Sequence, residues 1–245
     1  MITKKSELHQ EKGVYMFFDP LYFVFVGPAI IFTIWAQFKV KATFSKYEKI
    51  QASTHMTGRD VALRILEQSN IHDVKVEEVG GWFSDHYDSQ KKVLRLSPKV
   101  YHNSSIASVG VAAHEVGHAI QHAEGYAPLM FRQFMAPAAM IGSNMAMILI
   151  FIGAIMSAFG LIKLGIIGFA LAVIFQLITV PVELDASRRA KQLLDKYMII
   201  PQQDVRSVAL VLNAAAYTYL AAALAAVMQL LYFLFRFGFF GSNRD

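Results

Sequence analysis

Four long runs of uncharged, mostly apolar residues divide the chain, at residues 21–38, 134–162, 164–182 and 207–235. Each run is about as long as the roughly 17–25 apolar residues that a helix needs to cross the hydrocarbon core of a bilayer. A helix satisfies its own backbone hydrogen bonds, so helices are the expected structure of such runs in lipid. We therefore predict a mainly α-helical membrane protein with four transmembrane helices.

Between the first two runs the pattern changes to that of a small soluble α+β domain. The stretch "TGRDVALRILEQSN" has Thr57 as a candidate N-cap and apolar residues at helical spacing, so it predicts a helix. "VKVEEV" and "KKVLRLS" alternate apolar and polar residues, as half-buried strands do. "GGWFSDHYDS" between them is interpreted as a hairpin connection. Residues 104–124 return to a helical pattern.

These patterns give a division of the chain into seven parts. We expect a flexible N-terminal extension at 1–15, a transmembrane helix at 16–38, and a linker and α+β catalytic domain at 39–133. A transmembrane helical hairpin is predicted at 134–182, with its turn near 160–163. A charged helical segment follows at 183–206, then a transmembrane helix at 207–235 and a tail at 236–245. The first apolar run is too long for a removable signal peptide and contains Pro28.

Composition supports the membrane assignment and narrows the possible partners. Hydrophobic residues make up 55% of the chain and charged residues only 17%. The net charge of +5 is modest, and no basic helix carries interleaved aromatic residues, so nucleic-acid binding is not expected. The absence of cysteine excludes thiolate metal ligands and disulfides. The expected partners are the lipid bilayer and a protein or peptide substrate, membrane proteins included.

The distribution of basic residues predicts how the chain is oriented in a bacterial cell membrane. Lysines gather in 39–49 and basic residues again in 188–196, whereas the predicted turn of the hairpin holds only Lys163. Positive loops stay on the cytoplasmic side. Both large loops, and with them the catalytic side, are therefore predicted to face the cytoplasm. Both termini are then outside, although three lysines in the N-terminal tail weigh against this orientation.

A metal-site pattern lies in the last predicted helix of the α+β domain. "HEVGH" places His114 and His118 four residues apart, so both imidazoles project from one helix face and can hold one Zn²⁺. Glu115 lies beside the metal position, where a general base takes a proton from zinc-bound water. Gly117 costs about 0.8–1.0 kcal/mol relative to alanine inside a helix. Close approach of another backbone would explain that glycine.

A catalytic zinc site needs a third protein ligand, and three residues are candidates. His122 lies two turns from His114, which favours a supporting or surface role. Glu183 follows two membrane crossings that return the chain to the same side of the bilayer. It is favoured beside the HExxH motif, although a carboxylate at a helix start also interacts with the helix dipole. Asp185 is an alternative ligand, or a partner that orients a histidine.

These motifs together resemble the bacterial membrane-bound neutral zinc metallopeptidases, the YugP-like family. The resemblance rests on "HEVGHAIQHAEGYAPL", "VELDASRRA", "FFDPLY", "TGRDVALRIL", "DHYDSQKKVLRLS", "IGSN" and "LNAAAYTYLAAAL". It implies a gluzincin-type peptidase with His114, His118 and Glu183 as zinc ligands and Glu115 as catalytic base. Related membrane gluzincins often carry an aspartate four residues after the ligand glutamate. Here that position is Ser187.

The expected function is hydrolysis of peptide bonds by zinc-activated water, with a zinc-binding but catalytically silent scaffold as the alternative. A transporter is disfavoured because the four apolar runs lack the ionisable groups that transport requires. Arg188, Tyr217 and His86 are conceivable oxyanion stabilisers, although membrane flanking explains Arg188 equally well and packing is the favoured explanation of Tyr217. The strand "KVLRL" is expected to bind an extended substrate along its edge.

Overall fold

The computed structural model describes residues 19–81 and 84–238. The predicted N-terminal extension and most of the predicted C-terminal tail lie outside the described residues. The described part of the chain forms two compact units: unit 1 comprises residues 19–34, 134–177 and 221–238, and unit 2 comprises residues 35–81, 84–133 and 178–220. Each long helix contributes residues to both units.

Four helices are long and apolar enough to cross a membrane: α2 (Pro20–Tyr47), α6 (Ala127–Ile155), α7 (Phe159–Lys196) and α8 (Gln202–Arg236). The prediction of a mainly α membrane protein with a small α+β part is confirmed. The helices are longer than the uncharged runs. In particular, α7 continues through the charged stretch that follows the third run. The chain turns at residues 156–158, so the predicted turn at 160–163 lies inside α7 instead.

Within unit 1, glycines bring α6 and α7 into backbone contact. A Cβ atom added at Gly142 would lie 2.7 Å from the carbonyl oxygen of Gly168, and one added at Gly165 would lie 2.8 Å from that of Ala146. Lipid tails are as apolar as leucine side chains, so helices in a bilayer associate through such close packing. The same unit has a buried apolar cluster of Val26, Ile150, Ile162, Ile166, Tyr232 and Phe233.

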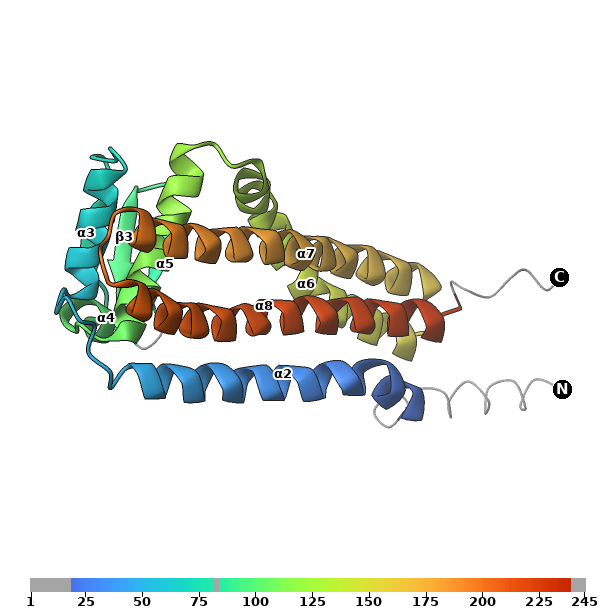
Figure 1. Cartoon of the computed structure of the whole chain (residues 1–245). Coiled ribbons are helices and arrows are strands. Elements are labelled where there is room, and N and C mark those ends of the chain that lie inside the picture. The colour runs from blue at the N-terminus through green and yellow to red at the C-terminus, as the bar shows by residue number, and fades with distance from the viewer. Residues whose placement is uncertain (1–18, 82–83, 239–245) are drawn as a thin grey trace, which may run out of the picture. The chain divides into compact units, whose positions relative to one another are not determined.

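Unit 2 contains the α+β part, in which α3 (Gly58–Gln68), α4 (Pro98–His102) and α5 (Ile106–Ala123) gather around a small sheet (Figure 1). Thr57 is the N-cap of α3, as predicted. Its side chain accepts from the Asp60 backbone N–H, and the Asp60 carboxylate accepts from the Thr57 N–H. This reciprocal capping box satisfies two donors that a helix start leaves unpaired. Ser105 caps α5 in the same way, by accepting from the Ser108 N–H.

The sheet consists of β1 (Lys75–Glu78), β2 (His86–Asp88) and β3 (Val93–Leu96), in the order β1-β3-β2. β1 pairs with β3 in parallel, whereas β2 pairs with β3 antiparallel, with Tyr87 opposite Leu94. The interpretation of "GGWFSDHYDS" as a hairpin connection is therefore wrong, because this stretch contains β2. The predicted substrate edge along "KVLRL" is also wrong. β3 has a strand on both sides, so β1 and β2 are the edges.

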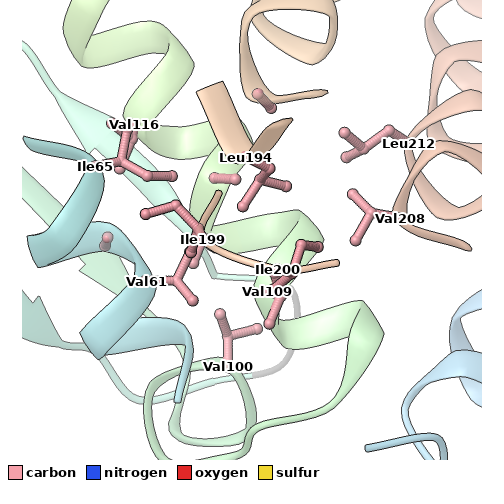
Figure 2. Packing of buried hydrophobic residues seen from close by; sticks show 14 of the residues in the cluster. Val61, Ile65, Val100, Val109, Val116, Leu194, Ile199, Ile200, Val208 and Leu212 are labelled. Carbon is pink, nitrogen blue, oxygen red and sulfur yellow. The ribbon is translucent and has the colours of Figure 1, made fainter. Parts of the chain in front are cut away.

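One hydrophobic core holds α5 in place, because it joins α3, α4 and α5 to residues from α7 and α8. Figure 2 shows Val61 and Ile65 from α3, Val100 from α4, Val109 and Val116 from α5, Leu194 from α7, Ile199 and Ile200 after α7, and Val208 and Leu212 from α8. Most of these side chains have no exposed surface. The helix that carries the HEVGH motif is therefore packed on several sides at once.

Gly117 is the point at which α5 touches α7. A Cβ atom at this position would lie 2.6 Å from the carbonyl oxygen of Ala186, which is closer than real Cβ contacts. The expectation that another backbone approaches this glycine is confirmed. Ala186 lies three residues after Glu183, so this contact also determines how near α7 brings Glu183 to the histidines.

Gly117→Ala is expected to destabilise the folded protein by about 1–3 kcal/mol, because overpacking against a backbone outweighs the gain in helix propensity. The midpoint of thermal unfolding in detergent measures this change. Gly110→Ala is the matched control on the same helix, since the nearest atom to its added Cβ belongs to the Val208 side chain, at 3.2 Å, and not to a backbone. Equal midpoints for the two variants would contradict the proposed role of the α5–α7 contact.

Candidate metal centre

Helix α5 presents His114 and His118 on one face. The four-residue spacing places the two imidazoles one turn apart, with ring centroids separated by 4.8 Å. Their side chains are only 12% and 11% exposed. The capped start of α5 and its burial in the core fix the direction in which both rings point.

Glu183 completes a group of three residues that could hold a metal ion. Its Oε2 atom lies 3.2 Å from His114 Nε2 and 3.4 Å from His118 Nε2. Zinc binds imidazole nitrogen and carboxylate oxygen at about 2.0–2.2 Å, so two ligands of a tetrahedral site are about 3.3 Å apart. Both distances from Glu183 match this spacing, and the three ligand atoms all lie within 4.8 Å of one another. Glu183 lies inside the continuous helix α7, which removes the alternative of a helix-start carboxylate.

The second oxygen of Glu183 is held by a different partner. Arg132, near the start of α6, donates from Nη1 to Glu183 Oε1 at 2.9 Å. The Tyr219 hydroxyl on α8 also interacts with this carboxylate. Glu183 is 4% exposed, and an unpaired carboxylate at such a position is costly. These contacts leave Oε2 directed at the histidines.

The other nitrogen of each histidine is also occupied. His114 Nδ1 lies 3.1 Å from the Ser187 hydroxyl, and His118 Nδ1 lies 3.0 Å from Gln121 Oε1. Metal-binding histidines usually donate their second N–H to such a partner, which fixes the tautomer and the ring orientation. In both rings Nε2 is therefore the atom that faces Glu183. Ser187 is placed to have a role of this kind for His114.

Glu115 lies in the wall of a cavity of about 200 Å³ that His114 also lines. Its carboxyl group is buried, and burial raises the pKa of Glu115 above its usual range, while the neighbouring histidines act in the opposite direction. A raised pKa suits a group that must accept and then return a proton near neutral pH. Asp85, just before β2, lines the same cavity and accepts hydrogen bonds from the backbone and hydroxyl of Ser97.

Asp185 and His122, the other candidate ligands, are not part of the three-residue group. Asp185 accepts hydrogen bonds from Gln121, Arg188 and Arg189. His122 Nδ1 lies 3.0 Å from the Tyr87 hydroxyl on β2. Asp185 reaches a ligand histidine only through Gln121, and His122 connects α5 to the sheet.

The three conceivable oxyanion stabilisers have other partners. Arg188 binds Asp185, Tyr217 packs against Trp35 with ring centroids 5.1 Å apart, and His86 contacts Ser84 and Arg95. Tyr219, which lines the cavity beside Glu115, occupies the place expected of such a group.

Sequence reasoning missed Tyr219, Arg132 and Gln121. The helical period separates Tyr219 from Tyr217, because residues two apart on a helix differ in direction by about 200°. Val211, Ala215 and Tyr219 follow one another at intervals of four and all line the cavity, so Tyr217 points elsewhere. Gln121 was visible as a polar residue three positions after the HEVGH motif, in a helix whose residues are mostly small or apolar.

Comparison with known proteins agrees with this geometry. The family described as "Putative neutral zinc metallopeptidase" matches residues 22–238. A relative from Bacillus subtilis, described as "Putative membrane protease YugP", is 46% identical over 216 residues, which cover 88% of this chain and 96% of the relative. No solved structure shows a significant match. The resemblance inferred from the motifs is confirmed, and the chain belongs to the neutral zinc metallopeptidase family.

Proposed function

We propose that the protein is a membrane zinc metalloendopeptidase of gluzincin type, with His114, His118 and Glu183 as zinc ligands and Glu115 as general base. The observation that carries the proposal is the convergence of three ligand atoms, from two helices, beside a buried carboxylate in one cavity wall. A scaffold that only binds zinc has no need of Glu115 at that place.

The chemistry follows from the positions of the side chains. When bound, zinc lowers the pKa of a coordinated water to about 7 and polarises the scissile carbonyl. Glu115 takes a proton from the attacking water and delivers it to the leaving amine. The Tyr219 hydroxyl contacts Glu183 when no substrate is bound, and it would donate instead to the carbonyl oxygen as negative charge develops there. Arg132 binds one oxygen of Glu183 and so keeps the other oxygen directed at His114 and His118.

The substrate is a peptide or protein segment that enters in an extended conformation. Among the described strands, β2 has a neighbour on one side only, and Asp85 at its start reaches the cavity beside Glu115. A peptide that added to the free edge of β2 would bring its backbone toward the site. Apolar residues contribute most of the other cavity walls, namely Val40, Phe44, Val111, Val211, Leu212 and Ala215. The cavity therefore suits an apolar side chain of the substrate.

The first prediction concerns the metal. Detergent-purified protein freed of loose ions is expected to hold about one zinc per chain by elemental mass spectrometry. Replacing both His114 and His118 by alanine removes two of three ligands and is expected to abolish retention. Wild-type protein that is folded and retains no zinc would contradict the proposed site.

The second prediction concerns the base. Glu115→Gln keeps the shape of the side chain and removes its proton-accepting charge, so it is expected to lower hydrolysis of a fluorogenic peptide by about 10²–10⁴-fold. The zinc content should stay unchanged. Glu67→Gln, at an exposed position on α3, is the control and should retain full activity. Zinc-loaded wild-type protein that cleaves no peptide from a broad library would favour the scaffold instead.

The third prediction concerns orientation in a bacterial cell membrane, where the distribution of basic loops supports a cytoplasmic active site. The chain contains no cysteine, so single cysteines can be labelled without background. In intact cells a membrane-impermeant maleimide is expected to label Met156→Cys, between α6 and α7. Lys91→Cys, beside β3, should react only after the cells are opened. The reverse pattern would place the active site outside.

A further inference from the structure

Gln121 is a polar residue with no exposed surface, and all of its hydrogen-bonding groups are engaged. Its Nε2 atom donates to the carbonyl oxygen of Val182 and to Asp185 Oδ2, each at 2.9 Å. Its Oε1 atom lies 3.0 Å from His118 Nδ1. One side chain on α5 therefore contacts a ligand histidine and two residues of α7.

These contacts determine which atom of His118 can bind a metal. Both protons of the Gln121 amide group are used by oxygens that can only accept, so the amide cannot be rotated without losing them. Oε1 must then accept a hydrogen bond, and the donor is His118 Nδ1–H. A neutral imidazole with its proton on Nδ1 has its lone pair on Nε2, the atom that faces Glu183.

The same side chain also positions the third ligand. Val182 and Asp185 lie on either side of Glu183 along α7, and both accept from Gln121. Gln121 therefore fixes the segment that carries Glu183 relative to the His118 ring. Asp185, which also binds Arg188 and Arg189, orients the Gln121 amide without touching the histidine itself.

We propose that Gln121 is a positioning residue that sets both His118 and Glu183 for metal binding, and that Asp185 acts on the site through Gln121. This inference rests on the proposed zinc site. The two histidines then have different hydrogen-bonding partners. The Ser187 hydroxyl holds His114, whereas the Gln121 amide, which the buried Asp185 carboxylate orients, holds His118.

Gln121→Met tests the inference, because methionine has a similar length and no hydrogen-bonding amide. Zinc affinity is measured by competition with a chromogenic chelator, and the ligand geometry by the visible absorption of the cobalt-substituted protein. Loss of such a supporting partner typically weakens metal binding by about 10–100-fold, and that loss is expected here, with an altered cobalt spectrum. Gln68→Met, at an exposed position on α3, is the matched control and should change neither.

A double variant separates positioning from general damage to the fold. Asp185→Ala and Gln121→Met are compared singly and combined. If Asp185 acts on the site through Gln121, the double variant is expected to bind zinc about as well as Gln121→Met alone, because the contact that Asp185 orients is already lost. A double variant that is weaker than Gln121→Met by the full factor that Asp185→Ala costs alone would overturn this link.

The outcomes distinguish this inference from the zinc site on which it rests. Wild-type protein without zinc would overturn both. Wild-type protein with zinc, and a Gln121→Met variant whose affinity and cobalt spectrum are unchanged, would overturn the role of Gln121 alone. If Gln121→Met fails to fold, Gln121→Glu decides. Its carboxylate can still accept from His118 but cannot donate to Val182 or Asp185, so an unchanged zinc affinity and cobalt spectrum would overturn the inference.

Discussion

Burial of the Glu183 carboxylate is the constraint on which the rest of the site depends. A charged group that leaves water loses several kcal/mol of solvation unless other charges and hydrogen bonds replace it. Here Arg132 takes one oxygen, and the two histidines lie at the other. The arrangement needs residues from α5, α6 and α7 at once, so these helix segments must meet at the same place.

The meeting of α5 and α7 requires an unusually short distance between their backbones. Gly117 permits it, because any side chain there would collide with the Ala186 carbonyl. Gln121, one turn further along α5, then joins the two helices through hydrogen bonds on either side of Glu183. Gly117 is therefore unfavourable for the helix taken alone, but it permits the backbone contact that brings Glu183 close to the two histidines.

The cavity lies beside this centre, and the sheet lies next to the cavity. β3 lies between two strands and contributes to the core. β2 has a free edge and begins directly after Asp85, which lines the cavity. The cavity itself is bounded by α2, α5 and α8, so apolar helix residues and the general base share one wall.

The sequence by itself determined the features that depend on local geometry. The apolar runs predicted the four helices, the four-residue spacing placed His114 and His118 on one face, and Gly117 indicated a close backbone contact. Helix and strand periods are properties of the backbone, so they can be read from neighbouring residues. Only the tertiary structure placed Glu183 rather than Asp185 with the histidines, put β3 in the centre of the sheet, and selected Tyr219 over Tyr217. Those choices depend on how segments far apart in the chain pack together, and no local pattern records that packing.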